Sequence, residues 1–190
     1  MTLSTAMAVL HKGLLQQVGK PNVVYDNPAN TFVARFIGSP SMNIFRMKTN
    51  DIWFTTSDPT VRLPRRQETH SAKVQQDVLV GIRPHHFHVV HENDPGISIE
   101  VNLVEHLGRS NFVICSPLTS DSFLFEQENI QLETEAAINY EPGAQLRISA
   151  DPEKITVFDL ANDVVECALP SETKNQSKLP KEIPTKEIGQ

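Results

Sequence analysis

Short runs of apolar residues separated by turn residues fill the chain between residues 44 and 167. Apolar and polar positions alternate within many of these runs, which is typical of half-buried β-strands. Turn signals such as Asn93-Asp94-Pro95-Gly96 and Glu141-Pro142-Gly143 stand between them. This pattern predicts a mainly β fold built as a small barrel or sandwich. The predicted strands are residues 52–56, 78–82, 87–90, 97–104, 112–115, 123–125, 130–132, 146–148 and 155–158.

The first residues of the chain show a different pattern. Residues 6–10 and 14–18 predict a β-hairpin that turns at His11-Lys12-Gly13. Pro21 is suited to the first turn of a short helix, and Asn27-Pro28 predicts the N-cap and first turn of a second one. We therefore expect a hairpin and two short helices before the strand-rich part.

The second predicted helix has one apolar face. Phe32 pairs with Phe36 and Val33 with Ile37 at a spacing of four residues, and Gly38 supplies a left-handed stop. These four side chains would leave an apolar surface without cover if nothing packs on the helix.

The last residues are poor in large apolar side chains. From about residue 170 the chain is rich in Lys, Ser, Glu and Pro, so it cannot offset the entropy of ordering and is predicted to be disordered. The expected organisation is therefore residues 1–43 as one piece, residues 44–169 as the β domain and residues 170–190 as a tail.

Net charge and cysteine content exclude several classes of protein. The chain carries 17 Lys and Arg against 23 Asp and Glu, a formal charge of −6, which argues against binding nucleic acid through its phosphates. Its uncharged apolar runs are far shorter than a bilayer span, so no direct membrane insertion is expected. Cys115 and Cys167 are the only cysteines. So sparse a pair is typical of reduced thiols in a cytosolic protein.

The sequence contains no phosphate-binding loop of the kind that binds ATP. Such a loop needs G-x-x-x-x-G-K-[ST], whose backbone N–H groups and Lys hold the phosphates. The closest stretch runs from Gly13 to Pro21, with one residue too many between Gly13 and Gly19 and with Pro21 in place of the hydroxyl. We therefore interpret it as part of the hairpin.

Residues 17–43 nevertheless resemble a known family. The stretch QVGKP followed by VYDNPANTFVARFIGSPSMN is similar to the hinge of carbohydrate-importer ABC ATPase subunits of the maltose and sn-glycerol-3-phosphate type. Gly81-Ile82-Arg83-Pro84, Val104-Glu105-His106-Leu107-Gly108 and Phe158-Asp159 follow in the order of that family's regulatory domain.

The resemblance implies a fold, a function and partners. The fold would be an OB-like and MOP-like (TOBE) barrel, preceded by a hairpin and two helices left from the end of a nucleotide-binding domain. The function would be a regulatory and dimerisation module without ATPase activity, because the ATP-hydrolysing half is missing. Expected partners are a second copy of the chain, an ATPase half or the permease subunits. The expected location is the cytoplasm, or the inner face of the plasma membrane as a peripheral protein.

The resemblance also marks hinge and regulatory contact residues. They are Phe36, Gly38, Ser39, Pro40, Met42, Asn43, Arg83, Pro84, Glu105, Leu107, Gly108, Phe158 and Asp159. Arg83 is expected to hold a neighbouring carboxylate, and Gly108 to provide a positive φ in a tight turn.

Histidines cluster just after Arg83. His86 and His88 would share one face of a strand and could hold a metal ion together, but no third ligand is fixed nearby. We therefore predict no metal site and no cofactor. His85 stands where the family usually has Glu, which predicts a loop that responds to pH.

Two other functions remain open from the sequence. One is a stand-alone MOP-like domain that binds a small oxyanion, although no cluster of Ser, Thr, Lys and Gly falls on one loop. The other is an OB-type nucleic-acid binder, which the negative charge and few aromatic residues disfavour. The basic residues Arg62, Arg65 and Arg66 are too few to follow a nucleic-acid backbone and are interpreted as a solvated loop.

Overall fold

The fold is that of a computed structural model of the chain, in which the structure is described for residues 5–66 and 76–160. The C-terminal tail predicted to be disordered, Cys167 and the end of the predicted β domain lie outside these described residues.

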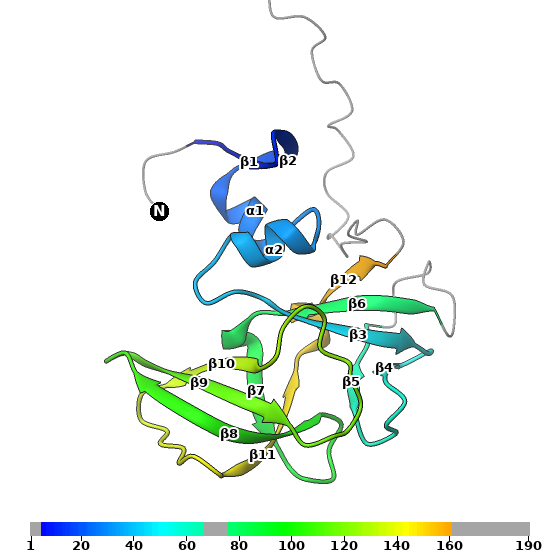
Figure 1. Cartoon of the computed structure of the whole chain (residues 1–190), viewed down its shortest axis with the longest axis vertical. Helices are drawn as coiled ribbons and strands as arrows, with labels where there is room; N and C mark the ends of the chain where they lie inside the picture. Colours follow the sequence, from blue (N-terminus) through cyan, green and yellow to red (C-terminus); the bar gives the residue numbers. More distant parts are fainter. Residues whose placement is uncertain (1–4, 67–75, 161–190) are drawn as a thin grey trace, which may run out of the picture.

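The N-terminal part forms the predicted hairpin and two helices (Figure 1). Strands β1 (Met7–His11) and β2 (Leu14–Gly19) are antiparallel. Lys12 and Gly13 at their turn both have positive φ, 48° and 80°, as a two-residue hairpin turn requires. Helix α1 (Pro21–Asp26) begins at the predicted proline. The hairpin and the first helix are thus confirmed.

The start of the second helix was predicted wrongly. Helix α2 spans Thr31–Phe36, and its N-cap is Asn30, whose side chain accepts a hydrogen bond from Val33 N at 2.9 Å. Asn27 instead caps the C-terminal end of α1. Asparagine is a favourable N-cap at either position. Only Asn30 stands three residues before Val33, whose N–H lies in the first turn of α2 and has no partner within the helix.

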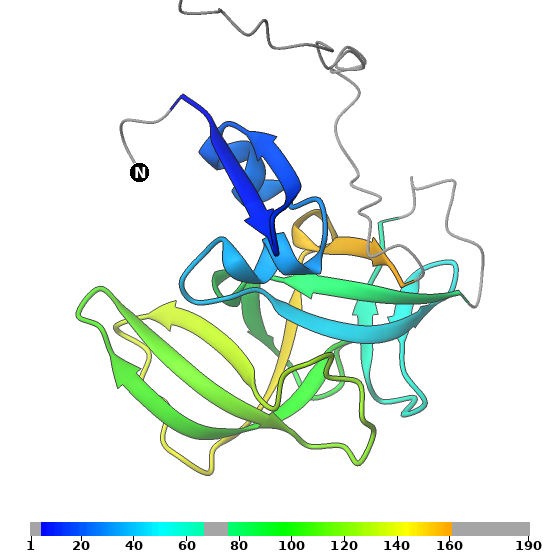
Figure 2. The same cartoon turned by 45° about the horizontal axis from the view of Figure 1, so that its top comes forward.

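The rest of the described chain forms two antiparallel five-stranded sheets (Figures 1 and 2). The first has the order β12-β6-β3-β4-β5 and the second β10-β9-β8-β11-β7. The first sheet contains β3 (Asn43–Thr49), β4 (Trp53–Thr55), β5 (Arg62–Pro64), β6 (Asp77–Ile82) and β12 (Thr156–Asp159). The second contains β7 (Phe87–Val90), β8 (Ile97–His106), β9 (Ser110–Pro117), β10 (Ile130–Glu135) and β11 (Gln145–Ala150).

Two short 3-10 turns carry the chain between the sheets. Turn η1 (Pro84–His86) leads from β6 to β7, and turn η2 (Pro152–Lys154) leads from β11 back to β12. Each turn starts with a proline, which fixes φ for the bend and has no N–H to leave unpaired. Strand β6 accordingly ends just before Arg83-Pro84.

One core joins the two sheets. Phe45, Val80 and Ile82 of the first sheet pack in the same buried cluster as Ile97 and Val113 of the second. A second cluster of Ala34, Met42, Ile44, Leu79 and Phe158 lies between α2 and the first sheet. A third cluster holds the hairpin to the helices through Val9, Val24 and Val33.

The strand prediction differs from the structure in three places: two strands were not predicted, and one predicted strand is absent. Strand β3 was not predicted, although its alternation of Phe45, Arg46, Met47 and Lys48 is regular, and β5 was missed because it is short and contains a proline. Residues 123–125 form a loop with one isolated bridge, Phe45 to Leu124. Each five-stranded ladder among the described residues is linear, so the mainly β, OB-type fold is built without a closed barrel.

Candidate functional site at the hinge

Arg83 joins the two helices to the first sheet. Its side chain is only 2% exposed and leaves the end of β6. Nη1 donates to Ala34 O and Ile37 O, and Nη2 donates to Tyr25 O, all at 2.8 Å. The guanidinium also lies 4.0 Å from the centre of the Tyr25 ring. We call Tyr25, Ala34, Ile37, Gly38 and Arg83 the hinge cluster.

The partners of Arg83 are helix ends. Tyr25 O lies at the C-terminal end of α1, and Ala34 O and Ile37 O lie at that of α2. The last carbonyls of a helix have no partner within it and carry partial negative charge, so a cation is stabilised there. The prediction that Arg83 binds a carboxylate is therefore wrong, because its hydrogen-bond acceptors are backbone carbonyls. Burial lowers the pKa of Arg83, while Tyr25 and Asp26 act in the opposite direction.

Gly38 fits closely beside this guanidinium. Its φ is +124°, and a Cβ on it would lie 2.9 Å from Arg83 Nη1 and 3.0 Å from Tyr25 Cε2. Glycine is needed both for the backbone angle and for the space. The expected left-handed stop after α2 is thus confirmed.

Met42 and Phe158 meet over Gly81. Both side chains are buried in the cluster between α2 and the first sheet. A Cβ at Gly81 would lie 2.5 Å from Met42 Sδ and 2.8 Å from Phe158 Cε2. Three residues far apart in sequence therefore meet at one point below α2.

Asn43 connects the two sheets. Its Oδ1 accepts from Gln131 N at 2.8 Å, and its Nδ2 donates to Gln131 O at 2.8 Å and to Ile82 O at 3.3 Å. The side chain is 2% exposed, and its amide bonds both backbone groups of Gln131 on β10, as the backbone of a neighbouring strand would. The segment after the hinge thus contacts both sheets.

Arg35 is a hinge residue that the sequence analysis missed. Its Nη1 lies 2.6 Å from a carboxylate oxygen of Glu126, and its Nη2 donates to Phe125 O. The guanidinium lies over the Phe125 ring. These partners are about 90 residues away, so sequence spacing gave no signal for the contact.

The structure brings together most, but not all, of the predicted hinge residues. Those around Arg83 and α2 are Phe36, Gly38, Ser39, Pro40, Met42, Asn43, Pro84 and, on β12, Phe158 and Asp159. Phe36 is 64% exposed at the end of α2. Glu105, Leu107 and Gly108 lie elsewhere, at the tip of the β8–β9 hairpin (Figure 1). Gly108 has the expected positive φ of 83°.

The histidines do not form the arrangement considered for a metal. His86 lies in η1 and His88 in β7, so the two are not on one strand. Within residues 5–66 and 76–160, no group of three or more His, Cys, Asp or Glu side chains is placed to hold a metal ion.

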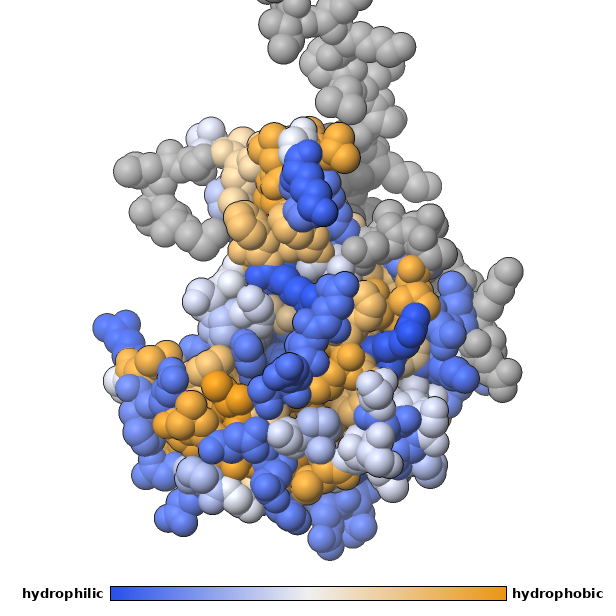
Figure 3. Space-filling view, viewed as in Figure 1, coloured by the Kyte–Doolittle hydropathy of each residue, from blue (hydrophilic) through white to orange (hydrophobic). Residues whose placement is uncertain are grey.

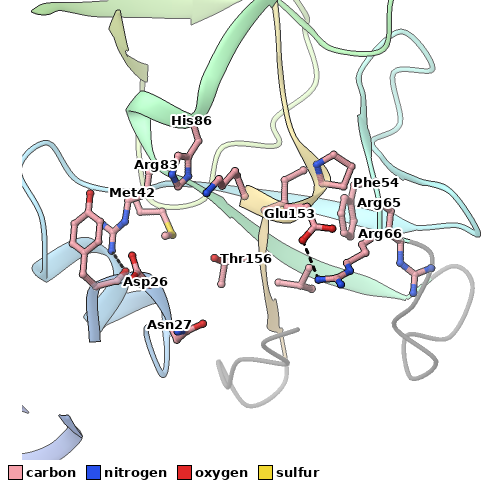
Figure 4. Close-up of a pocket in the computed structure, with 15 residues that line it drawn as sticks. Asp26, Asn27, Met42, Phe54, Arg65, Arg66, Arg83, His86, Glu153 and Thr156 are labelled. Carbon is pink, nitrogen blue, oxygen red and sulfur yellow. Dashed lines mark hydrogen bonds and ion pairs between the residues drawn. The ribbon is translucent and has the colours of Figure 1, made fainter. Parts of the chain in front are cut away.

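A pocket of about 240 Å³ opens beside the hinge cluster (Figure 4). Asp26 at the end of α1 and the C-cap Asn27 border it on one side, and Phe54, Arg65 and Arg66 on the other. Lys154 and the edge strand β12 complete its lining, together with Arg83 and His86. Arg66 forms an ion pair with Glu153 at 3.2 Å. We call this the hinge pocket.

His86 is neutral at ordinary pH. Its partial burial, followed by the charges of His85 and Lys154, lowers its pKa from 6.5 to about 4. The unfolded chain binds a proton near pH 6.5 that the folded chain binds only near pH 4, so stability falls as the pH is lowered through this window.

We expect His86→Gln to flatten this pH dependence. The free energy of unfolding of the unmodified chain should fall between pH 6.5 and about 4, with a contribution from His86 on the order of 1 kcal/mol because the ring is partly solvated. Urea titrations at several pH values measure it. His88→Gln, a change at an exposed histidine, is the control. Equal slopes for the His86 variant and the unmodified chain would contradict the assignment.

None of the helices in the described parts of the chain is long and apolar enough to cross a membrane.

Comparison with known proteins gives consistent family matches. Residues 38–87 match the MalK OB fold domain, and residues 80–158 match the TOBE domain. The chain is 35% identical over 159 residues to the sn-glycerol-3-phosphate import ATP-binding protein UgpC of Psychromonas ingrahamii, covering 84% of this chain and 41% of the relative. It is 34% identical over 167 residues to the sulfoquinovosyl glycerol transport ATP-binding protein SmoE of Agrobacterium fabrum, covering 86% and 44%.

A third relative extends the comparison to another solute. The diacetylchitobiose uptake system ATP-binding protein MsiK of Streptomyces coelicolor is 32% identical over 173 residues, covering 83% of this chain and 45% of the relative. The chain thus spans about two fifths of the length of these relatives, in their C-terminal part. The chain therefore contains the MalK OB fold and TOBE domains and is similar in sequence to the C-terminal part of carbohydrate-importer ATP-binding subunits.

Proposed function

We propose that the chain is the regulatory and dimerisation module of an ABC importer ATP-binding subunit, with no ATPase activity of its own. The observation that carries this proposal is the hinge cluster, in which Arg83 binds the ends of both helices from the end of β6. Such a junction transmits movement between whatever covers the helices and the sheets. The names of the relatives favour sugars or glycerol phosphates as the solute class of the importer.

The proposed domain organisation follows the sequence prediction. Residues 1–43 correspond to the end of a nucleotide-binding domain and its hinge, residues 44–169 to the regulatory domain and residues 170–190 to a tail. The hairpin is attached to the helices through Gln17, whose amide donates to Asn27 O and accepts from Ala29 N, both at 2.8 Å. Hairpin and helices are therefore expected to move together.

The hairpin and helices present an apolar surface suited to an ATPase domain. Its exposed side chains are Leu10, Leu14, Leu15, Val18, Val23 and Phe36. Figure 3 shows hydrophobic residues gathered where the hairpin and helices lie, toward the top of the view. The expected bare face of α2 needs correction, because Val33 is fully buried with Val9 and Val24 and only Phe36 is exposed. The uncovered surface is thus mainly that of the hairpin.

This assignment predicts partners and a location. A second copy would pair through the regulatory domain, while an ATPase half, supplied by another chain or another part of the same protein, would cover the hairpin surface. Permease subunits would be contacted through that assembly. The module would act in the cytoplasm, or at the inner face of the plasma membrane as a peripheral component.

We expect the chain to be a dimer at micromolar concentration and to bind no ATP. Sedimentation tests the first expectation, and calorimetric titration with Mg-ATP tests the second. Phe36→Ser tests which surface forms the dimer. Phe36 is exposed on the surface of the hairpin and helices, so the variant should remain a dimer if the copies pair through the sheets. A monomer, or a micromolar dissociation constant for Mg-ATP, would contradict the proposal. A variant that becomes monomeric would place the interface on the hinge surface instead.

A further inference from the structure

Residues 123–127 form a strap that lies against the first sheet and leads into the second. The strap belongs to the loop between β9 and β10, which passes beside β3 (Figure 1). Phe123 anchors its start, because this ring is buried and stacks on Phe45 of β3 with ring centres 5.6 Å apart. Phe125 N donates to Ile44 O at 3.0 Å, so the strap also bonds the backbone of β3.

Helix α2 holds this strap through Arg35, in its last turn. Nη1 of Arg35 lies 2.6 Å from Oε2 of Glu126, Nη2 donates to Phe125 O, and the guanidinium lies 5.5 Å from the centre of the Phe125 ring. We call this set of contacts the catch. The Arg35 side chain is 23% exposed and that of Glu126 67% exposed. An ion pair open to water is weaker than a buried contact, so it can open while the sheets stay folded.

The backbone of the strap is unusual at the catch. Glu126 has a φ of +50°, and it shares a positive φ with only one other non-glycine residue in the described part of the chain, Lys12 in the hairpin turn. A side chain with a Cβ disfavours this region, so the surrounding contacts must hold the residue there. Arg35 contacts both the Glu126 carboxylate and Phe125 O, which belongs to the peptide bond before Glu126.

The far end of the strap is fixed to β10. Gln127 Oε1 accepts from Ile44 N at 3.0 Å, and its Nε2 donates to Asn129 O at 3.2 Å. The chain then enters β10, where the Asn43 side chain bonds both backbone groups of Gln131 at 2.8 Å. A continuous series of contacts therefore runs from α2 through the strap to the second sheet.

We propose that the strap is a coupling device and that the catch transmits movement of α2 to β10. A displacement of α2 carries Arg35 with it and either pulls on the strap or opens the catch. Coupling between two parts of a protein travels through such packed and hydrogen-bonded contacts. The device goes beyond the proposed function, since it depends on the fold alone and its test needs neither an ATPase nor a permease.

Hydrogen exchange of single amides in the full chain, followed by NMR, tests this coupling. In Arg35→Gln, we expect exchange of the Phe125 and Gln131 amides to become about tenfold faster, because the change removes charge-assisted contacts. Amides of β7 and β11, at the other end of the second sheet, should exchange as before. A purely local role of Arg35 would speed exchange at Phe125 and leave Gln131 unchanged.

Glu126→Gln opens the catch from the strap side and should give the same pattern in a milder form. Combined with Arg35→Gln, it should add nothing further, because both changes remove one ion pair. Glu128→Gln removes an exposed carboxylate two residues along the same loop and should have no effect. Raising the salt concentration to about 0.5 M should speed exchange at Gln131 in the unmodified chain but not in Glu126→Gln, because salt screens exposed charges.

Three outcomes would overturn the proposal. They are unchanged exchange at Gln131 in both catch variants, equal acceleration by the Glu128 change, and acceleration that spreads equally to β7 and β11. The last would show a general loss of stability and no particular path from α2 to β10. Because Glu126→Gln changes only an exposed side chain, it provides the result even if Arg35→Gln does not fold.

Discussion

Replacing Arg83 with methionine is expected to lower the free energy of unfolding by about 3–5 kcal/mol, a large fraction of the stability of a domain of this size. The change removes three hydrogen bonds to Tyr25 O, Ala34 O and Ile37 O. It leaves those helix-terminal carbonyls without a partner inside the protein, and an unsatisfied buried polar group costs more than an average hydrogen bond contributes. Urea unfolding followed by circular dichroism measures the loss.

Two further variants serve as controls for the loss of stability in Arg83→Met. Arg109→Met makes the same chemical change at an exposed hairpin tip and should alter stability by less than about 0.5 kcal/mol. Arg83→Lys keeps the charge but loses the planar fork that reaches three carbonyls, so it should fall between the other two. An unfolding midpoint for Arg83→Met equal to that of the unmodified chain would show that the helices are held by other contacts.

The same substitution tests the hinge more directly than stability does. If Arg83 fixes both helices to the sheet, hydrogen exchange in Arg83→Met should become faster from α1 to α2 than in β6 and β8. Uniform acceleration over all described residues would indicate a global loss of stability and no particular role at the hinge.

Local features of the fold could be predicted from the sequence because short-range chemistry decides them. The hairpin depends on a turn at Lys12-Gly13 that accepts positive φ, and α1 depends on Pro21. Where two local signals compete, prediction fails. Asn27-Pro28 and Asn30 both suit a helix start, and only the packing of Val33 against Val9 and Val24 selects Asn30.

Contacts across the chain could be predicted only where the family resemblance supplied them. Motifs of the resemblance name Gly38, Met42, Arg83 and Phe158. The structure places Gly38 against Arg83, and Met42 and Phe158 together over Gly81. The acceptors of Arg83 could not be predicted, because backbone carbonyls leave no mark in the sequence. Strand β3 does show a clear alternation of buried and exposed positions, whereas β5 is too short to show one.

The hinge pocket illustrates the limit of sequence patterns. Its lining comes from the end of α1, the end of β5, η1, η2 and β12. Arg65 and Arg66 looked like a solvated loop because their neighbours in sequence are polar. The ion pair between Arg66 and Glu153 joins residues that follow β5 and precede β12, the strands at the two ends of the order of the first sheet, so no sequence pattern reveals it.

Replacing Phe45 with alanine is the second change expected to have a large effect. Phe45 is fully buried on β3, stacks on Phe123 with ring centres 5.6 Å apart and meets Phe87 edge to face at 6.2 Å. Truncating such a ring removes apolar burial and leaves a cavity, at a cost of about 3–5 kcal/mol. Urea or thermal unfolding measures it, and Phe36→Ala is the matched control, because that ring is 64% exposed. The control should change stability by less than about 1 kcal/mol.

The form of the unfolding transition matters as much as its midpoint. Phe45 belongs to the first sheet and Phe87 to the second, while Phe123 lies beyond β9, inside the segment that matches the TOBE domain. Since these rings share one core, both matched domains should unfold together, and Phe45→Ala should lower the midpoint of a single transition. Two transitions in the unmodified chain, with only the first shifted by the substitution, would show that the sheets fold separately. A regulatory movement would then arise between the sheets, and the hinge cluster around Arg83 would no longer be the only junction needed to explain it.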